Sequence, residues 1–188
     1  AMPAFISLLV FRLMFNGIGP INNMLVNFGI ERIPFFTDPI LAKISVLAIN
    51  TWVGAPYFMV LLSGSLTNIS STLYEAAEID GATKMQQFKH ITLPMLLFQT
   101  APVLILSFAY NFNNFGAIYL LTDGNPVNSN LKFAGETDIL VTWLYKLTVN
   151  QQQFGMAAVI SIVLFAFIAT VSLYNFRKSK SFTEEDMI

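Results

Sequence analysis

The sequence contains no cysteine and a single histidine among its 188 residues. The absence of cysteine excludes a disulfide framework, a thiolate nucleophile and a zinc–thiolate site. One histidine and scattered acidic residues are a poor inventory for a metal centre, so we expect no metal site. The sequence also lacks a glycine-rich phosphate loop with its lysine. We therefore expect no catalytic residue and no cofactor bound by this chain.

Charge is scarce as well. Only 11% of the residues are charged, and the net charge is −1. This balance gives no indication of a nucleic-acid partner. Hydrophobic residues, by contrast, make up 55% of the chain, and its mean hydropathy is +0.61. They come in long blocks, a pattern typical of helices that cross a membrane. The composition therefore predicts an all-α integral membrane protein surrounded by lipid.

Three apolar blocks are long enough to span a membrane, at about residues 41–66, 95–121 and 154–176. The block at residues 2–15 would reach only ~20 Å as a helix, against ~30 Å of hydrocarbon. We therefore expect a truncated span there, in a chain that is the C-terminal part of a longer protein. A short block at residues 139–149 carries Trp143 and Tyr145, which predicts a helix at the membrane interface.

The segment 70–94 is the one long polar stretch between apolar blocks. Two capping-box spacings, from Thr72 and from Thr83, predict the starts of two short helices. Gly81 between them suits the left-handed position that closes the first helix. Pro94 is expected to begin the next apolar helix, where its missing N–H costs little. The segment is thus predicted to form a helix–glycine–helix structure.

Seven residues of this segment fall at a characteristic spacing: Glu75, Ala76, Ala77, Gly81, Ile91, Leu93 and Pro94. The pattern resembles the cytoplasmic coupling loop of the membrane subunits of binding-protein-dependent ABC importers. The resemblance implies a polytopic helical bundle of the type I importer permease type, whose loop docks on a cytoplasmic ATPase. It assigns this ATPase-coupling role to Glu75, Ala76, Ala77, Asp80 and Gly81. The whole chain 1–188 would then be the C-terminal part of one permease transmembrane domain.

Charges near the last span indicate the orientation of the chain. Arg177, Lys178 and Lys180 follow the block 154–176, and basic residues after a span favour the cytoplasmic side. This places the tail 177–188 in the cytoplasm. Counting back across two spans places the segment 70–94 there as well, as the resemblance requires. We therefore expect a multi-pass protein of the cytoplasmic membrane.

Two polar stripes lie inside the predicted spans. Asn50, Gly54 and Tyr57 share one helix face, with Val53 beside them. The same spacing recurs in the next span, at Ser107, Asn111 and Asn114, with Tyr110 beside them. Neither stripe carries a charge, so the residue types favour an uncharged, hydroxyl-rich substrate in a membrane cavity. Polar side chains that hold neighbouring helices together are an alternative, and residue types alone leave both open.

The sequences around both stripes resemble the larger membrane subunit of maltose and maltodextrin importers. The matching segments are Asn50-Thr-Trp-Val-Gly-Ala-Pro-Tyr57 and Ser107-Phe-Ala-Tyr-Asn-Phe-Asn-Asn-Phe115. The resemblance implies that the eight stripe residues line a sugar site midway across the membrane. It also implies four partners: a smaller permease subunit, two copies of an ATPase that holds ATP and Mg, and an extracytoplasmic sugar-binding protein.

Two other functions remain open at this point. One is a related importer for another oligosaccharide or for a glycerol phosphate, although a phosphate would call for a basic residue on the stripes. The other is an ion-coupled secondary transporter or a channel. That class normally shows acidic residues inside the membrane and has no use for an ATPase-docking loop.

Overall fold

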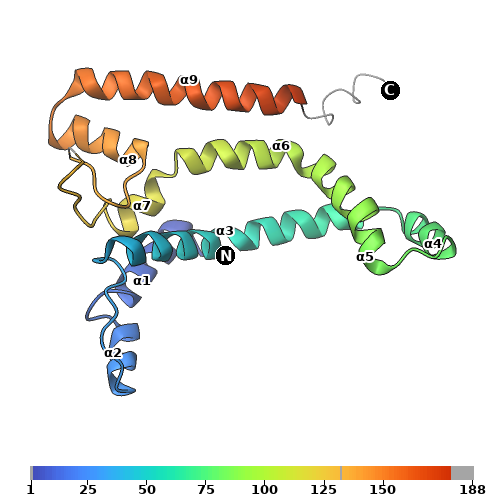
Figure 1. Ribbon diagram of the computed structural model, residues 1–188, viewed down its shortest axis with the longest axis horizontal. Coiled ribbons are helices and arrows are strands. Elements are labelled where there is room, and N and C mark those ends of the chain that lie inside the picture. The colour runs from blue at the N-terminus through green and yellow to red at the C-terminus, as the bar shows by residue number, and fades with distance from the viewer. Residues whose placement is uncertain (1, 132, 179–188) are drawn as a thin grey trace. The chain divides into compact units, whose positions relative to one another are not determined.

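The computed structural model describes residues 2–131 and 133–178, and this part of the chain is helical without a β-strand (Figure 1). Its elements are α1 (Ala4–Met14), α2 (Pro20–Asn27), α3 (Pro39–Thr67), α4 (Ser71–Ile79), α5 (Lys84–Gln87), η1 (Phe88–Thr92), α6 (Leu93–Phe112), α7 (Phe115–Leu121), α8 (Leu140–Tyr145), η2 (Lys146–Asn150) and α9 (Phe154–Lys178), where η marks a π-helical turn.

Three continuous helices are long and apolar enough to cross a membrane: Pro39–Thr67, Lys84–Phe112 and Phe154–Arg177. The expected all-α membrane fold with three spans is thereby confirmed. The block predicted as a truncated span forms the short apolar helix α1. Of the predicted cytoplasmic tail, only its first residues belong to α9, and the remainder lies outside the described residues.

The described residues form two compact units. The first unit contains the chain up to Gly54 together with Asn111–Phe167, and the second contains Ala55–Tyr110 with the end of α9 from Ile168. The helices α3, α6 and α9 each contribute residues to both units. The amide residues of the two stripes fall in the first unit, and the segment 70–94 falls in the second.

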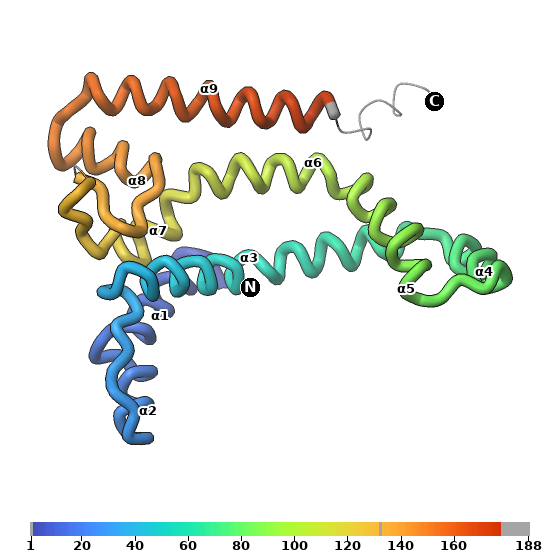
Figure 2. The backbone as a smooth tube through the Cα atoms, viewed as in Figure 1, coloured from blue at the N-terminus to red at the C-terminus, as the bar shows by residue number. Residues whose placement is uncertain are grey.

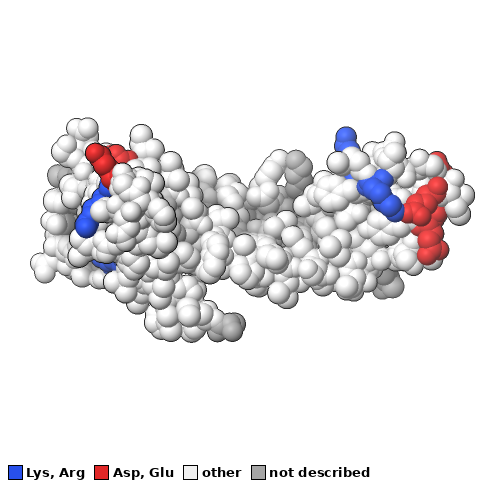
Figure 3. All heavy atoms as spheres, turned by 90° about the horizontal axis from the view of Figure 1, so that it is seen from below, with Lys and Arg blue, Asp and Glu red and all other residues white. Residues whose placement is uncertain are grey.

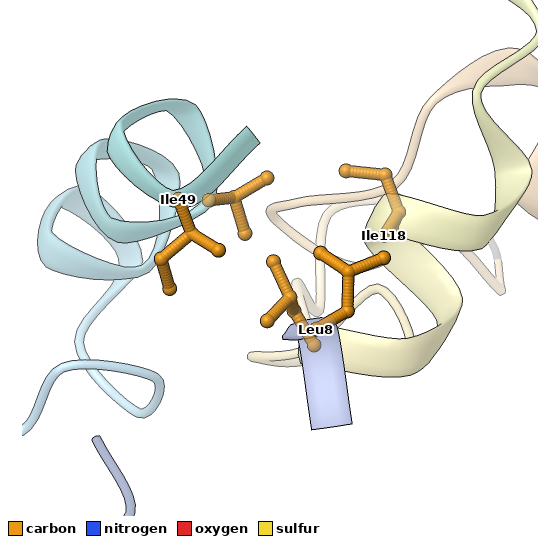
Figure 4. Close-up of a cluster of buried hydrophobic side chains, with 5 residues drawn as sticks. Leu8, Ile49 and Ile118 are labelled. Atoms are coloured by element: carbon orange, nitrogen blue, oxygen red, sulfur yellow. The ribbon is translucent and has the colours of Figure 1, made fainter. Parts of the chain in front are cut away.

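The first unit has a small apolar core at the meeting of α1, α3 and α7. Leu8, Ile49 and Ile118 point toward one another from these three helices (Figure 4), and Val46 and Leu121 complete the buried cluster. Partly buried side chains pack around it, namely Phe11, Phe15, Phe36, Val53, Leu120 and Ile139. This core fixes α7 against the first half of α3, and so determines where the start of α7 lies.

The helix α2 was not predicted. Its start nevertheless has a recognisable signal, because Gly19 is the N-cap and Pro20 occupies the first helical turn. Asn22 anchors the helix and is fully buried. Its side chain accepts from the Ile33 backbone N–H at 2.8 Å and donates to the Ile33 carbonyl at 3.0 Å. One buried amide thus ties α2 to the extended segment that leads into α3.

The predicted helix over residues 95–121 is two helices in the structure. α6 ends at Phe112, and α7 begins at Phe115 after a break at Asn113 and Asn114. Asn114 has a non-helical backbone and serves as the N-cap of α7. A side-chain amide that can satisfy the first N–H groups of a helix makes such a restart favourable.

Pro94 lies in the first turn of α6, as the sequence predicts, but no break in the helix precedes it. The backbone coils without interruption from α5 through η1 into α6, as Figure 2 shows. Within η1 the N–H of Leu93 donates to the carbonyl of Phe88, five residues earlier. Because proline has no N–H and its ring clashes with the carbonyl four residues before it, the wider π-turn accommodates Pro94 inside a continuous helix.

The loop between α7 and α8 is held by charged side chains of the first unit. Asp138 is buried and accepts from Lys146 Nζ at 2.8 Å and from the Gly135 N–H at 2.7 Å. Glu136 pairs with Lys43 near the start of α3 and also accepts from Asn128. The interfacial helix predicted at residues 139–149 corresponds to α8 and the π-turn η2.

Candidate functional site

The coupling segment, residues 70–94, forms two short helices around a glycine corner. Gly81 has a φ of +76°, so the predicted left-handed position is confirmed. The predicted capping box at Thr83 is confirmed too, because Thr83 N–H donates to Gln86 Oε1 at 2.8 Å and Gln86 N–H donates to Thr83 Oγ1 at 3.4 Å. This corner reverses the chain between α4 and α5 (Figure 1).

The capping box predicted at Thr72 is wrong. The N-cap of α4 is Ser70, whose Oγ accepts from the Thr72 N–H at 3.3 Å. Because the helix already begins at Ser71, Thr72 lies inside it and cannot close a box with Glu75. The Ser70-Ser71-Thr72 run offers more than one residue with a capping hydroxyl, and the earliest of them starts the helix.

Two side-chain contacts connect α4 to the helix that follows the corner. Tyr74 Oη lies 2.8 Å from Thr92 Oγ1, a buried threonine in η1. Glu78 forms an ion pair with Lys84 at the start of α5. The hydrogen bond and attraction from Lys84 hold the pKa of the exposed Glu78 carboxyl below its ordinary value. Both contacts link α4 to the helical segment that follows the corner.

The inner side of the corner is hollowed. A hollow of about 320 Å³ is lined by Ala77, Asp80, Gly81, Ala82, Gln86, Gln87, His90 and Ile91. Of the predicted coupling residues, Ala77 is half-buried in this hollow, whereas Glu75, Ala76, Asp80 and Gly81 are exposed. Acidic side chains gather over α4, with basic ones beside them (Figure 3). Ile79 and Met85 add exposed apolar surface on either side of the corner.

Three residues of the predicted stripes are brought together in the first unit. Asn50 Nδ2 donates to Asn111 Oδ1 at 3.3 Å, and Asn114 Nδ2 donates to Asn50 Oδ1 at 3.0 Å. Asn114 Oδ1 also accepts from the N–H of Ala117 at 3.3 Å. The amides therefore form a connected cluster between α3 and the break that separates α6 from α7. We call these three residues the amide cluster.

The other stripe residues differ in their surroundings. Gly54 adjoins open space, since a Cβ placed there would meet no atom within 4 Å. Val53 packs against the apolar core instead, because the same turn of α3 faces both α1 and α7. Tyr57, Ser107 and Tyr110 belong to the second unit, where both tyrosine side chains are mostly exposed.

Among the described residues, no group of three or more His, Cys, Asp or Glu side chains could hold a metal ion. Two features of the first unit were missed from the sequence. They are the buried Asp138–Lys146 ion pair and the buried Asn22. Their sequence signals are a carboxylate eight residues before a lysine and an asparagine in the first turn after a Gly-Pro pair, both too common to be diagnostic.

Comparison with known proteins gives one family and several similar relatives. The family profile described as "binding-protein-dependent transport system inner membrane component" matches residues 1–180. The chain is 43% identical over 197 residues to the maltodextrin transport system permease protein MdxF of Bacillus subtilis, covering 100% of this chain and 45% of MdxF.

Two other relatives have a similar sequence identity to this chain. The galactooligosaccharides transport system permease protein GanP of B. subtilis is 41% identical, over 98% of this chain and 44% of GanP. The maltose/maltodextrin transport system permease protein MalF of Vibrio vulnificus is 45% identical, over 96% of this chain and 35% of MalF. The chain thus spans less than half the length of these relatives.

Solved structures have the same fold. A bacterial ABC transporter involved in the import of the acidic polysaccharide alginate superposes with a TM-score of 0.79 at 25% identity, covering 95% of this chain and 61% of that chain. A structure of a bacterial alginate ABC transporter in complex with an alginate pentasaccharide-bound periplasmic protein gives a TM-score of 0.78 at 26% identity, covering 97% of this chain and 62% of that chain.

Proposed function

We propose a function for this chain on the basis of its family. The chain belongs to the inner membrane components of binding-protein-dependent transport systems. It acts as a permease subunit of an ATP-driven ABC importer that moves maltose- or maltodextrin-type sugars across the cell membrane. The observation that carries this proposal is the 43–45% identity to MdxF and MalF over almost the entire chain. The uncharged amide cluster is consistent with a neutral, hydroxyl-rich cargo.

The proposed transport step starts at the coupling segment. A cytoplasmic ATPase that holds ATP and Mg binds around Glu75, Asp80 and Gly81, and its closure moves α4 and α5. The helix Lys84–Phe112 is continuous from α5 to the end of α6, and in this proposal the movement passes along it. The helix ends at Phe112, one residue after Asn111 of the amide cluster. ATP hydrolysis belongs to the partner, and this chain is not itself an enzyme.

The proposed assembly contains four further subunits. A smaller permease subunit pairs with this chain, two copies of the ATPase bind on the cytoplasmic side, and an extracytoplasmic sugar-binding protein delivers the cargo. The alginate transporter in complex with a periplasmic protein is a similar fold in which such a partner is seen. The coupling segment and the C-terminal tail face the cytoplasm in this proposal.

A second candidate cargo is another oligosaccharide, which the 41% identity to GanP favours. The proposed sugar-contacting residues are the same for both cargoes: Asn50, Val53, Gly54, Tyr57, Ser107, Tyr110, Asn111 and Asn114. Among them Val53 is partly buried and packs against the apolar core. A glycerol phosphate is disfavoured because these residues include no basic side chain.

Uptake measurements test the proposal. Cells that rely on the full-length protein and its partners should accumulate maltodextrins, and uptake should stop on ATP depletion but survive collapse of the ion gradient. Uptake with the reverse dependence would identify an ion-coupled transporter. A panel of maltose, maltotriose, a galactooligosaccharide and glycerol phosphate distinguishes the candidate cargoes.

The coupling role has its own test in the full-length complex. Glu75→Lys reverses the charge offered to the ATPase, and Gly81→Pro cannot adopt a φ of +76°. Both should insert normally into the membrane but abolish sugar-stimulated ATP hydrolysis. Full stimulation in both variants would rule out docking at this face.

A further inference from the structure

The short helix α2 lies across the direction of α3. Both belong to the first unit, and Figure 1 shows α2 extending to the side of the first half of α3 rather than alongside it. Because α3 is long and apolar enough to cross a membrane, its axis follows the membrane normal to within an ordinary tilt. A helix that crosses this direction runs along the membrane surface.

Side-chain contacts hold α2 close to the neighbouring ends of α1 and α3. The buried Asn22 amide donates to the carbonyl of Asn16 at 3.1 Å and exchanges two hydrogen bonds with the backbone of Ile33. The ring of Phe15, which follows α1, lies 4.9 Å from the ring of Phe35 in the segment leading into α3. These contacts place α2 at the level where α1 ends and α3 begins, which is the boundary between lipid and water.

One row of side chains on α2 is apolar and largely uncovered. Met24 and Phe28 lie one helical turn apart, and they are 60% and 76% exposed. Ile21 and Leu25, beside them on the helix, are only partly buried. Moving an exposed Met or Phe side chain out of water contributes up to about 1.5–3 kcal/mol. This row therefore favours an apolar environment.

A second row on α2 is polar. Asn23 and Asn27 are both exposed, and they lie about 100° around the helix from the apolar row. Arg32 extends this polar surface, since its guanidinium donates to Asn23 Oδ1 at 3.4 Å and to the Gly17 carbonyl at 3.1 Å. Glu31 beside it balances the charge of Arg32. Apolar contact, rather than attraction to charged headgroups, is thus the stronger source of attachment.

We propose that α2 lies in the interfacial layer of the membrane, with Met24 and Phe28 inserted among lipid acyl chains and Asn23 and Asn27 in contact with water. The partner of this surface is the phospholipid layer itself. The inference is independent of the cargo, because it requires only that α3 crosses the membrane. Through the Asn22 contacts, α2 holds the segment that leads into α3 at the lipid surface.

Spin labels on single cysteines test this orientation. Met24→Cys, Phe28→Cys and Val26→Cys are made in the full-length protein carrying no other cysteine, and the complex is assembled in phospholipid vesicles. Val26 is the matched control, because it is apolar and 45% exposed but lies on the opposite face, two residues from both others. Labels at Met24 and Phe28 should collide more often with oxygen, which concentrates among acyl chains, than with a water-soluble nickel complex. The ratio of the two collision rates should be several-fold higher there than at Val26.

A charged substitution gives a second readout. Met24→Glu places a carboxylate in the lipid, which is costly, whereas Val26→Glu places the same group in water. Backbone amide exchange at residues 23–27 should therefore quicken several-fold in Met24→Glu and stay unchanged in Val26→Glu. Both side chains are exposed, so neither substitution removes packing within the protein.

Collision ratios at Met24 and Phe28 equal to that at Val26 would overturn the proposal. Labels at Met24 and Phe28 that are shielded from both reagents would overturn it as well, because another protein segment would then cover this row in place of lipid. Equal exchange rates in Met24→Glu and Val26→Glu would contradict attachment through the apolar row.

Discussion

At the scale of single residues, two glycines of the first unit differ in whether the structure has room for a side chain in their place. Gly124 has a φ of +77°, and a Cβ at this position would overlap the Asp138 carboxylate and Lys146 Nζ. Gly116 lies within α7, and a Cβ there would meet no atom within 4 Å. The two positions therefore form a matched pair for the same substitution.

Gly124→Ala should destabilise the protein by roughly 2–4 kcal/mol, because alanine is strained at positive φ and its methyl displaces a buried ion pair. Gly116→Ala should instead leave stability unchanged or raise it by up to about 1 kcal/mol, since alanine has the higher helix propensity and its methyl group would meet no neighbouring atom. Thermal unfolding of the purified protein in detergent measures both. Equal midpoints for the two variants would contradict the packing described around Asp138.

At the scale of elements, the start of α5 depends on the Thr83 cap. Thr83→Ala removes the hydroxyl that accepts from Gln86 N–H and should destabilise α5 by about 1 kcal/mol. Hydrogen exchange of the backbone amides at residues 84–87 should quicken accordingly. Thr72→Ala is the control, because Ser70 caps α4 and Thr72 lies within the helix. Faster exchange in α4 than in α5 would contradict these assignments.

The contact between α4 and α5 should weaken in acid. Because the folded-state pKa of Glu78 is lowered, its ion pair with Lys84 contributes fully above the ordinary glutamate pKa of about 4.3. That contribution is lost as the pH falls through the lowered value. Exchange of the α4 and α5 amides should therefore rise below this range, more in the native protein than in Glu78→Gln. A pH response that is identical in both would exclude the ion pair as its cause.

The elements also differ in how well the sequence alone predicts them. Hydropathy was sufficient to predict three long apolar helices, since a run of about 20 apolar residues is the signal of a membrane-spanning helix, although it misplaced both ends of the second one. Gly81 and the Thr83 cap were predictable because they depend only on near neighbours. The break between α6 and α7 was not, because it depends on a core formed with α1 and α3 and on an amide contact from Asn50. Likewise, the stripes grouped Val53 with Asn50, although packing separates their roles.

At the scale of the whole molecule, orientation in the membrane is the property that the proposed function most needs. Because these 188 residues contain no cysteine, a single cysteine introduced among them is the only reactive thiol in this part of the protein. Met85→Cys, which is exposed on α5, should react only with a reagent that enters the cytoplasm. Asn130→Cys, exposed in the loop between α7 and α8, should react from the opposite side. The reverse pattern would exclude docking of a cytoplasmic ATPase at the coupling segment.

The π-turn η1 sets the direction in which the coupling segment projects from the axis of α6. A turn that uses one residue more than an α-helical turn shifts everything before it by about 100° around the helix axis. The rotational position of α4 and α5 about the axis of α6 is therefore set by the number of residues between Gln87 and Pro94. Deleting His90 should rotate the coupling segment away from its partner and uncouple ATP hydrolysis from transport, whereas His90→Ala, which keeps the count, should not.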